Sequence, residues 1–301
     1  TEKIYCLPVH AKLHLPGKNQ PSEATLAKEM LQDILAWFPD RKLVFIGDGA
    51  YSVNNLLKDL DERVTYIGVM RSDAEIYTPT PPKQPKSKRG PKPRKGPRLP
   101  SPREATKKAD RNRSGKGPWM WQSIEATAYG VTRSLQVVSF HAVWPKVLGL
   151  RPILVVLVRD PAGKFKDKYL FTTDLNADLS WVISTFSRRW SIEVAFKSSK
   201  QVMKIQSPQH WCRQSIEKLS PWVWLMQSVV ALWYITEGRK LPAAHAARQR
   251  FGTWDTEWSL GHMLRVLRTA VLDTTIRPTS ATKQDLYQLL DRLENYLALA
   301  S

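Results

Sequence analysis

The sequence FSRRWSIEVAFKSSK, residues 186–200, is the stretch around which the rest of the chain is best understood. Neither Pro nor Gly interrupts it, and positions 186, 189, 193, 197 and 200 share one face of a helix. This face carries Phe, Arg, Glu, Lys and Lys, so a single carboxylate lies within a line of cations. Ile192 and Phe196 lie beside this face and are expected to turn toward a core. Taken alone, the face is more typical of a solvated helix, in which Glu193 pairs with the cations four residues before and after it at roughly 0.2–0.5 kcal/mol each.

The composition indicates a globular protein with a strong positive charge. The 301 residues are 42% hydrophobic and include twelve Trp, which is enough for one large domain or two modest ones with a buried core. Lys and Arg number 46 against 27 Asp and Glu, which leaves a net charge of +19. A field of this sign favours polyanions, and nucleic acid is the first candidate partner.

Cysteine usage and hydropathy argue against a disulfide-stabilised, zinc-binding, secreted or membrane-spanning protein. Cys6 and Cys212 have no CxxC partner and no nearby His cluster, so neither a disulfide framework nor a zinc site is expected. The start of the chain has no apolar signal-peptide core. The longest apolar run, residues 219–235, contains polar residues and is shorter than the ~20 residues of a membrane span. We therefore expect a cytoplasmic protein that does not bind membranes.

The first 77 residues have the pattern of a strand–helix–strand unit. An amphipathic helix is predicted over residues 23–38, with Ser22 as its N-cap. The short apolar run at 43–46 is expected to be a strand covered on both faces. Further predicted elements are extended chain over 3–15, a helix at about 53–60 and a strand over 64–70. Such units build parallel sheets.

The composition changes abruptly at Thr78. Ten of the 21 prolines lie between positions 79 and 118, and residues 83–116 hold 14 Lys or Arg against two acidic residues. With almost no apolar side chains, this segment buries too little surface to offset its ordering entropy, and we expect it to be mobile. It is either a solvated linker or, as we favour, an arm that contacts the phosphate backbone of nucleic acid.

After this basic segment the pattern changes twice. Runs rich in Val, Ile, Thr and aromatic residues predict strands at 119–128, 131–144, 152–159 and 167–173. Beyond Lys200, helices are predicted at about 213–237, 242–251, 258–271 and 282–299. The predicted domain division is 1–77, first part of the catalytic core; 78–118, basic Pro-rich segment; 119–177, strand-rich insertion; 178–237, second part of the core; and 238–301, helical region.

Asp48 is the most suggestive carboxylate in the first part of the chain. It follows the apolar run at 43–46, between Gly47 and Gly49, and open α/β sheets bind ligands at the carboxyl ends of their strands. The glycines allow a sharp turn and a close approach. Taken alone, an Asp between glycines is more often a turn residue. Together with Glu193 on a later helix, however, it provides two carboxylates of the kind that hold two Mg²⁺ ions in phosphoryl-transfer sites.

These residues carry a resemblance to a known family. The spacing Phe186-(2)-Arg189-(3)-Glu193-(6)-Lys200 resembles the YREK signature of bacterial insertion-sequence DDE transposases, and Asp48 within FIGDGAY resembles their second catalytic Asp. The motifs WSIE at 190–193 and QHW at 209–211 are similar to the same pattern. The separation of 145 residues between Asp48 and Glu193 resembles the branch with a β insertion. The resemblance implies an α/β fold, with an RNase H-like core, a β-strand-rich insertion and C-terminal helices.

The resemblance also implies roles for individual residues. Asp48 and Glu193 would be catalytic and would ligate Mg²⁺ or Mn²⁺, with two ions in the complete enzyme. The implied DNA-binding residues are Arg189, Lys200, Phe186, Arg188 and Lys197. Phe186 stands where the family has Tyr, so the hydroxyl is missing. The implied activity is cleavage of DNA at insertion-sequence ends and transfer of the freed 3′ hydroxyl to target DNA by a homodimer, in the bacterial cytoplasm at the nucleoid.

The chain departs from the family pattern at its start. The family carries its first catalytic Asp on an opening strand, but no Asp precedes Asp33, which lies in the helix predicted at 23–38. The chain is therefore interpreted as a C-terminal fragment or a truncated copy whose two-metal catalysis would be crippled. Asp73 and Asp174 are the nearby carboxylates that could compensate, and we favour neither.

Three other functions stay open at this point. The chain could be a catalytically dead remnant that binds DNA, an RNase H-like nuclease without strand transfer, or a basic RNA-binding protein that prefers single strands. His10 and His14 lie four apart in an extended segment, where this spacing does not converge on a metal. Because no P-loop, HExxH or GxSxG motif is present either, hydrolase chemistry based on histidine is not expected.

Overall fold

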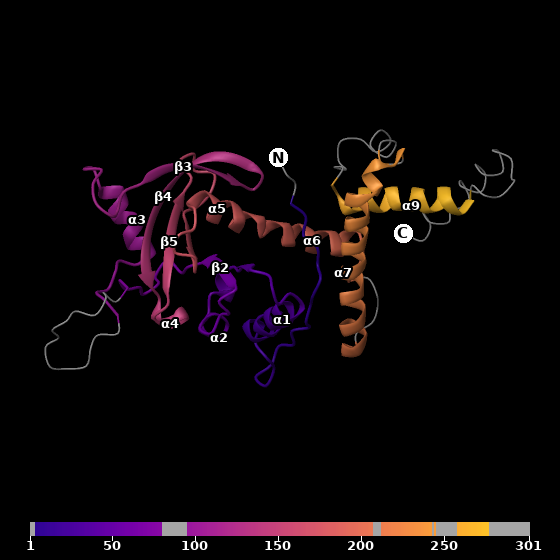
Figure 1. Ribbon diagram of the computed structural model, residues 1–301, viewed down its shortest axis with the longest axis horizontal. Coiled ribbons are helices and arrows are strands. Elements are labelled where there is room, and N and C mark those ends of the chain that lie inside the picture. Colours follow the sequence, from indigo (N-terminus) through magenta and orange to yellow (C-terminus); the bar gives the residue numbers. More distant parts are fainter. Residues whose placement is uncertain (1–3, 80–94, 207–211, 243, 245–257, 277–301) are drawn as a thin grey trace. The chain divides into compact units, whose positions relative to one another are not determined.

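A computed structural model describes residues 4–79, 95–206, 212–242, 244 and 258–276 (Figure 1). The fold is mixed α/β, and the chain forms two compact units. Unit 1 consists of Thr1–Tyr5 and Ala11–Glu193, and unit 2 consists of Cys6–His10 and Val194–Ser301. Unit 1 contains the sheet with the helices that pack on it, and the described part of unit 2 is mainly helical.

Six strands of unit 1 form one curled sheet in the order β1-β2-β6-β5-β4-β3 (Figure 1). The strands are β1 (Leu43–Ile46), β2 (Val64–Val69), β3 (Gln122–Ala128), β4 (Val131–Val143), β5 (Pro152–Arg159) and β6 (Lys168–Thr172). β1 and β2 are parallel, with Ile46 opposite Ile67, and the other neighbouring pairs are antiparallel. The predicted parallel unit and the four later strands are confirmed. The later strands extend the same sheet, and their interpretation as an insertion stays a prediction.

The described helices of unit 1 are α1 (Glu23–Trp37), the 3-10 helix η1 (Gly49–Tyr51), α2 (Asn54–Leu57), α3 (Pro102–Arg111), α4 (Pro145–Leu148) and α5 (Leu179–Arg188). Four of these six (α1, η1, α3 and α5) begin at polar caps that the sequence provides, whereas α2 and α4 have no side-chain cap. The hydroxyl of Ser22 accepts a hydrogen bond from the amide of Thr25, so the predicted cap of α1 is confirmed. Asp178 caps α5 in the same way by accepting from the amide of Trp181. The helix predicted at about 53–60 is shorter than expected.

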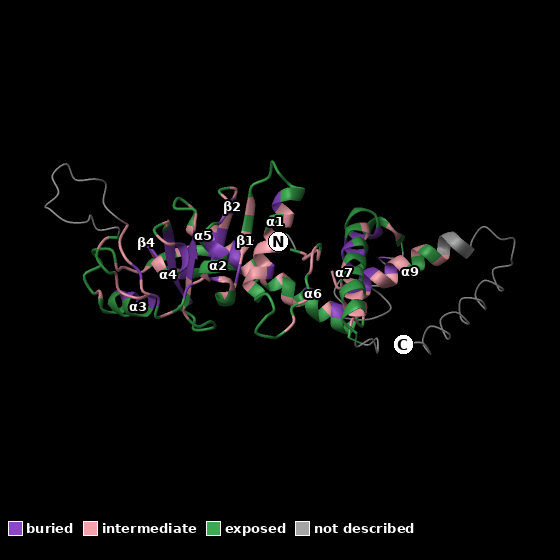
Figure 2. Cartoon of the chain, turned by 90° about the horizontal axis from the view of Figure 1, so that it is seen from below, coloured by how far each residue is buried: buried purple, intermediate pink, exposed green. Residues whose placement is uncertain are grey.

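The sheet separates two apolar clusters. The first, called here the Tyr66 cluster, joins Phe45 and Tyr66 of the sheet to buried residues of α1, α2, α3 and α4. The second, called the Phe186 cluster, joins Ile46 and Ile67 of the sheet to Phe186 and its neighbours on α5. Successive residues of β1 and β2 thus face opposite layers, as the period of a strand requires. Figure 2 shows that the buried residues concentrate on the strands.

β1 differs from the strand expected at this position. A strand covered on both faces was predicted, but the side chain of Val44 is 45% exposed. The reason is that α5, the helix on this face, packs on β3 and β2, so that Val44 at the end of the described sheet lies beyond its cover. The described residues of the segment predicted as extended, 3–15, join no strand of this sheet.

The expectation of a mobile basic segment is wrong for its second half. Residues 102–111 form α3, and a capping box fixes its start, because Ser101 and Glu104 each accept a hydrogen bond from the other's amide. Ala105 and Ala109 are buried in the Tyr66 cluster. Counting large apolar residues missed this helix because its buried face consists of small side chains. Residues 80–94 of the same segment lie outside the described residues.

The single helix expected over residues 186–200 is two helices. α5 ends at Arg188, and α6 (Trp190–Gln201) begins two residues later. Arg189 keeps helical dihedral angles, but its amide bonds the carbonyls of Phe186 and Ser187, so the turn tightens. The expectation that Ile192 and Phe196 turn toward a core is also wrong, since they are 40% and 45% exposed.

Unit 2 is built around α7 (Arg213–Thr236), with the 3-10 helix η2 (Gly238–Lys240) and α9 (Leu260–Ile276). The helices predicted at about 213–237 and 258–271 are thereby confirmed. The buried hydroxyl of Ser199 on α6 donates to the side-chain carbonyl of Gln227 on α7 over 2.7 Å. Among the described helices, none has both the length and the apolarity to cross a bilayer. The helix predicted at 282–299, the QHW motif at 209–211 and most of the helix predicted at about 242–251 lie outside the described residues.

Candidate active site

Asp48 lies immediately beyond the carboxyl end of β1, as the sequence predicted. It is the N-cap of η1, and its Oδ1 accepts a hydrogen bond of 2.9 Å from the amide of Ala50. Its other carboxylate oxygen receives no hydrogen bond from the described residues. One oxygen of Asp48 therefore fixes the turn, and the second is available to a ligand.

The two glycines beside Asp48 have different roles. A Cβ on Gly47 would lie 2.4 Å from the hydroxyl oxygen of Tyr66, whereas a Cβ on Gly49 would meet nothing within 4 Å. Neither glycine has a positive φ, so the sharp turn is not the reason for their presence. Gly47 instead leaves room for the fully buried ring of Tyr66 beneath the turn that carries Asp48.

A short polar network holds this ring in place. The hydroxyls of Ser52 and Tyr66 lie 3.2 Å apart, and Ser52 Oγ donates to the carbonyl of Val69 over 2.7 Å. Burial raises the pKa of Tyr66 well above its ordinary value, and the nearby charge of Asp48 adds to this effect. The phenol is therefore a neutral structural support for the Asp48 turn.

Glu193 lies in the first turn of α6, directly after the break between the two helices. The Nη2 atom of Arg189 donates to Glu193 Oε1 over 2.9 Å, so the first of the two ion pairs expected on a solvated helix face is confirmed. The second is wrong, because Glu193 forms no ion pair with Lys197 among the described residues. The side chains of Arg189 and Glu193 are 28% and 39% exposed, which leaves the pair open to solvent and ligands. The buried Nε of Arg189 has no hydrogen-bond partner in the described part of the chain.

Asp48 and Glu193 are connected through the apolar layer on one side of the sheet. Ile46, two residues before Asp48, packs in the Phe186 cluster. Phe186 lies three residues before Arg189, where the chain turns tightly from α5 into α6; this turn with Glu193 is called here the Arg189 corner. Alternate residues of extended chain point to the same side, and Asp48 keeps an extended backbone. No hydrogen bond or ion pair joins Asp48 to Glu193 within the described ranges, and no group of three metal-ligating side chains gathers there.

The chemistry of this donor set fits a divalent ion. Mg²⁺ and Mn²⁺ prefer carboxylate oxygens. Asp48 and Glu193 each use one oxygen in the contacts above, and each retains a second that accepts no hydrogen bond from the described residues. These two carboxylates are therefore the residues that would hold such an ion.

The predicted DNA-binding residues have contrasting surroundings. Phe186 is 8% exposed and packs in the core, so a DNA contact by its ring stays a prediction. Arg188 ends α5 and is exposed, and Lys197 and Lys200 are exposed on the part of α6 that belongs to unit 2. Arg188, Lys197 and Lys200 form no ion pair with the described residues, so their charges are free for an anionic partner.

The two carboxylates considered as substitutes for a first catalytic Asp have other partners. Both oxygens of Asp73 accept hydrogen bonds of 2.9 Å from Arg71. Asp174 accepts from the amide of Asn176, two residues further on, and so closes a turn after β6. Each has a local structural role, in keeping with our preference against both.

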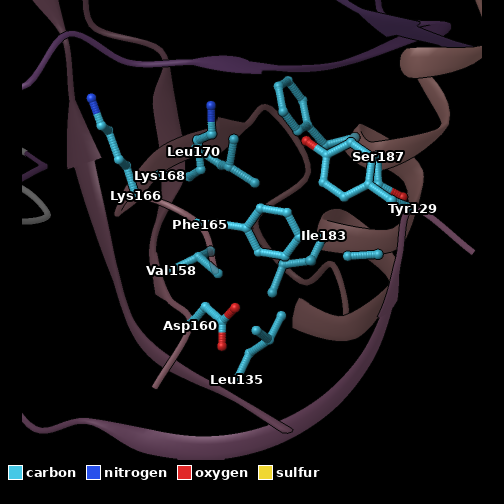
Figure 3. A pocket seen from close by; sticks show the side chains of 12 residues that line it. Tyr129, Leu135, Val158, Asp160, Phe165, Lys166, Lys168, Leu170, Ile183 and Ser187 are labelled. Carbon is cyan, nitrogen blue, oxygen red and sulfur yellow. The ribbon is translucent and has the colours of Figure 1, made fainter. Parts of the chain in front are cut away.

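A small pocket adjoins the Arg189 corner (Figure 3). Its volume is about 50 Å³, far below the ~300 Å³ at which drug-sized ligands begin to fit. Asp160 lines it, is 7% exposed, and has an Oδ2 without a hydrogen-bond partner among the described residues. The other lining residues are Ala128, Tyr129, Leu135, Val158, Phe165, Lys166, Lys168, Leu170, Ile183, Phe186 and Ser187. The pocket could admit a small group with a hydrogen-bond donor.

A comparison with known families matches part of the chain. Residues 16–127 match the family described as DDE superfamily endonuclease. The match supports a DDE-type transposase or nuclease family. It includes Asp48 and ends before Glu193, and no curated protein matches the chain. The family suggests an RNase H-like fold, a DNA substrate and metal-dependent DNA cleavage, with divalent ions as the typical cofactor.

Sequence reasoning missed one polar network of unit 1. Arg159, the last residue of β5, forms ion pairs with both Asp110 of α3 and Asp167, and its guanidinium lies 4.6 Å from the ring centroid of Trp121. Asp110 is 49 positions away in the sequence. No local pattern marks a contact of this range, although an isolated acid in a basic segment is a weak signal.

Proposed function

We propose that this protein is a DDE-type DNA transposase that cleaves DNA at insertion-sequence ends and joins the freed 3′ hydroxyl to target DNA. The observation that supports it most is the match of residues 16–127, which contain Asp48, to the family described as DDE superfamily endonuclease. Asp48 and Glu193 would hold Mg²⁺, with Mn²⁺ as a substitute. In the complete enzyme two ions and a homodimer on paired DNA ends would be required.

The proposed chemistry consists of two phosphoryl transfers. In the first, a water oxygen attacks the phosphorus, a proton leaves that water, and the bond to the 3′ oxygen breaks to give a 3′ hydroxyl. In the second, this hydroxyl loses its proton as it attacks a target phosphodiester, and another 3′ oxygen leaves. Each step exchanges one P–O bond for another. When bound, a divalent ion would stabilise the charge on the reacting phosphate.

The residues of the corner have complementary roles in this proposal. The planar fork of Arg189 suits a phosphate, which it can bind through two N–H donors. To do so, Arg189 would turn from Glu193 and leave that carboxylate to the ion. Lys200, Arg188 and Lys197 would add further phosphate contacts along the DNA strand, with Phe186 supporting the corner from the core.

The experiment is cleavage of a plasmid that carries the DNA flanking the coding sequence, with the full chain and Mg²⁺. Asp48→Asn and Glu193→Gln should each lower cleavage about 100-fold or more, because a metal ligand is lost. The matched controls are Asp73→Asn, which also follows a strand, and Glu217→Gln, whose side chain forms an i,i+4 pair of 2.7 Å with Arg213. Cleavage by Glu193→Gln at the level of the controls would exclude this function.

A second candidate is a protein of the same family that binds or cuts DNA without strand transfer. The engagement of Glu193 by Arg189 favours it, because the carboxylate is already neutralised in this state. A second plasmid added to the reaction distinguishes the candidates. Strand transfer joins the cleaved end covalently to that plasmid, a nuclease leaves free ends, and a binding protein retards both DNAs on a gel without cutting either.

A further inference from the structure

Within the described residues of unit 1, the surface around α3 is strongly cationic, and the proposed chemistry does not use it. The described residues 95–116 carry eight exposed basic side chains: Lys95, Arg98, Arg103, Lys107, Lys108, Arg111, Arg113 and Lys116. None of these eight forms an ion pair with any described residue. Two acids, Glu104 and Asp110, lie in the same segment, and both are engaged by the capping box and by Arg159. Glu104 attracts Arg98 and Lys108 over a longer range, but eight cations against two acids leave the segment strongly positive.

α3 presents this charge on one face. Pro102, Ala105, Thr106 and Ala109, which are spaced three or four residues apart, form the buried face. Arg103, Lys107 and Arg111 are four residues apart on the exposed side, with Lys108 beside them. At 1.5 Å rise per residue, successive cations of this stripe lie ~6 Å apart along the axis. The stripe therefore spans ~12 Å, a length over which one strand of B-DNA carries three or four phosphates.

α3 is held against the rest of unit 1 at both ends. At its start, the amide of Arg103 donates to the carbonyl of Ser72 over 3.0 Å. At its end, Asp110 accepts from the guanidinium of Arg159, and from the indole of Trp121 over 3.0 Å. The loop that follows is closed by Asn112, whose amide donates to the carbonyls of Lys116 and Trp119. Ordering a cationic surface before binding reduces the entropy that association costs.

We propose that α3 and the loop after it, residues 101–117, form a preordered surface that binds the sugar–phosphate backbone of duplex DNA. This inference rests on the proposed function, because DNA is the polyanion that the protein would act on. It adds an interaction surface outside the carboxylate site. A straight helix with a fixed line of cations suits the regular phosphates of a duplex. Base recognition is not part of its role, since Lys and Arg contacts to phosphate carry no sequence information.

The test is the salt dependence of DNA binding by the full chain, measured by fluorescence anisotropy with a duplex of arbitrary sequence and EDTA in place of metal. The variant is Arg103→Gln/Lys107→Gln/Arg111→Gln. The matched control is Lys18→Gln/Lys42→Gln/Lys58→Gln, which removes three exposed cations of unit 1 that have no ion pair with the described residues. Both triple variants change the net charge equally, so long-range attraction is the same.

Each phosphate contact contributes about 0.9 to the slope of log K against log salt concentration, and losing one lowers the slope by about 1. We expect the α3 variant to lower the slope by about 2–3 and the affinity at least tenfold at about 50 mM salt, with less than a threefold change in the control. Equal slopes for the two triple variants, or a preference of the wild type for single strands, would overturn the proposal. Thermal unfolding of both variants checks that the fold is retained.

The outcome is separable from that of the proposed function. Binding is measured without metal, and none of the six substituted residues belongs to the Asp48 and Glu193 site. Suppose that Glu193→Gln still cut DNA, and that the α3 variant showed the reduced slope of log K against log salt concentration. The proposed catalytic function would then be wrong, and the proposed DNA-binding surface would be supported. If the catalytic variants lost cleavage and the two triple variants bound DNA with equal slopes, only the proposal of a DNA-binding surface on α3 would be wrong.

Discussion

The guanidinium of Arg189 donates to the carboxylate of Glu193 over 2.9 Å at the point where α5 gives way to α6. The pair joins a residue that would bind phosphate to one that would bind a cation. Each partner therefore neutralises the other until DNA and metal are present. A metal ion would therefore compete with the guanidinium of Arg189 for the carboxylate of Glu193, and this competition can be measured.

Replacing Arg189 with Gln should tighten the binding of Mn²⁺, because the metal no longer competes with a guanidinium for Glu193. We expect an increase of roughly 2–5-fold in affinity at low salt, in line with a partly exposed pair of about 0.5–1 kcal/mol. Isothermal titration of the full chain with Mn²⁺ measures it. Arg213→Gln, which releases Glu217 on α7, is the control and should leave the affinity unchanged. Weaker Mn²⁺ binding by Arg189→Gln would contradict the competition.

Substitution of Gly47 by Ala should destabilise unit 1, because the new Cβ would lie 2.4 Å from the Tyr66 hydroxyl and 3.0 Å from the Cβ of Tyr51. Overpacking of this kind typically costs about 1–3 kcal/mol. Gly49→Ala has open space and should change the free energy of unfolding by less than ~1 kcal/mol. Urea denaturation of the two variants compares them. Equal urea midpoints for Gly47→Ala and Gly49→Ala would show that the buried ring of Tyr66 can move to make room for the new Cβ at little cost in stability.

The stability of unit 1 should fall in alkali through Tyr66. Burial raises the pKa of this phenol in the folded protein, so folding favours its neutral form. Its contribution is complete below the ordinary pKa of about 10 and is lost as the pH rises above that value toward the raised pKa. Urea midpoints at about pH 9 and 11 should therefore differ more for the wild type than for Tyr66→Phe. At pH 9 the phenylalanine variant should be about 1 kcal/mol less stable than the wild type, since the contact with Ser52 is missing, and this deficit should shrink or reverse at pH 11.

The replacement Asp110→Asn distinguishes two influences on DNA affinity: how firmly α3 is held in place and how positive its surface is. Hydrogen bonds from Arg159, the largest cause, lower the pKa of Asp110, so the ion pair is complete above a pH of about 4 and is lost as the pH falls through the lowered pKa. The variant adds one positive charge, and charge alone would tighten DNA binding. We expect roughly threefold weaker binding instead, because α3 is less firmly held.

Hydrogen exchange over residues 101–111 provides the second measurement for Asp110→Asn. Faster exchange of these amides together with weaker binding would support the positioning of α3 by Arg159. Tighter binding with unchanged exchange would show that the helix is held by its buried face alone. Asp73→Asn, which releases Arg71 at the surface, is a suitable control of equal charge.

The sequence was informative where the period of its apolar residues matched one element. Runs rich in Val, Ile, Thr and aromatic residues between 119 and 173 predicted all four strands of this part, and Ser22 predicted the start of α1. Arg189 was predicted as a helical residue, and its dihedral angles are helical, but no Pro or Gly marks the tightened turn that separates α5 from α6. The candidate carboxylates were found from their positions after a strand and on a helix.

Contacts between distant segments were beyond the reach of pattern reasoning. The folding of α3 depends on the small residues Ala105 and Ala109, whose burial needs a surface supplied by other parts of unit 1. Its attachment depends on Arg159, which lies 49 positions further along the chain. A composition rich in Lys, Arg and Pro is typical of disordered segments. The expectation of disorder was wrong for α3 because it considered the amount of apolar surface and not its arrangement on one face of a helix.

The position of β1 at the end of the sheet affects how the catalytic variants should be interpreted. A terminal strand presents unpaired backbone groups that can recruit a strand from another molecule, and proteins oppose this with charges near the edge. Asp48 lies just beyond the carboxyl end of this four-residue strand, so Asp48→Asn removes a negative charge close to the edge. Self-association of that variant would abolish activity for a reason unrelated to metal binding. Size-exclusion chromatography beside each cleavage assay would reveal it, and Glu193→Gln, which leaves the edge intact, is the cleaner probe of the chemistry.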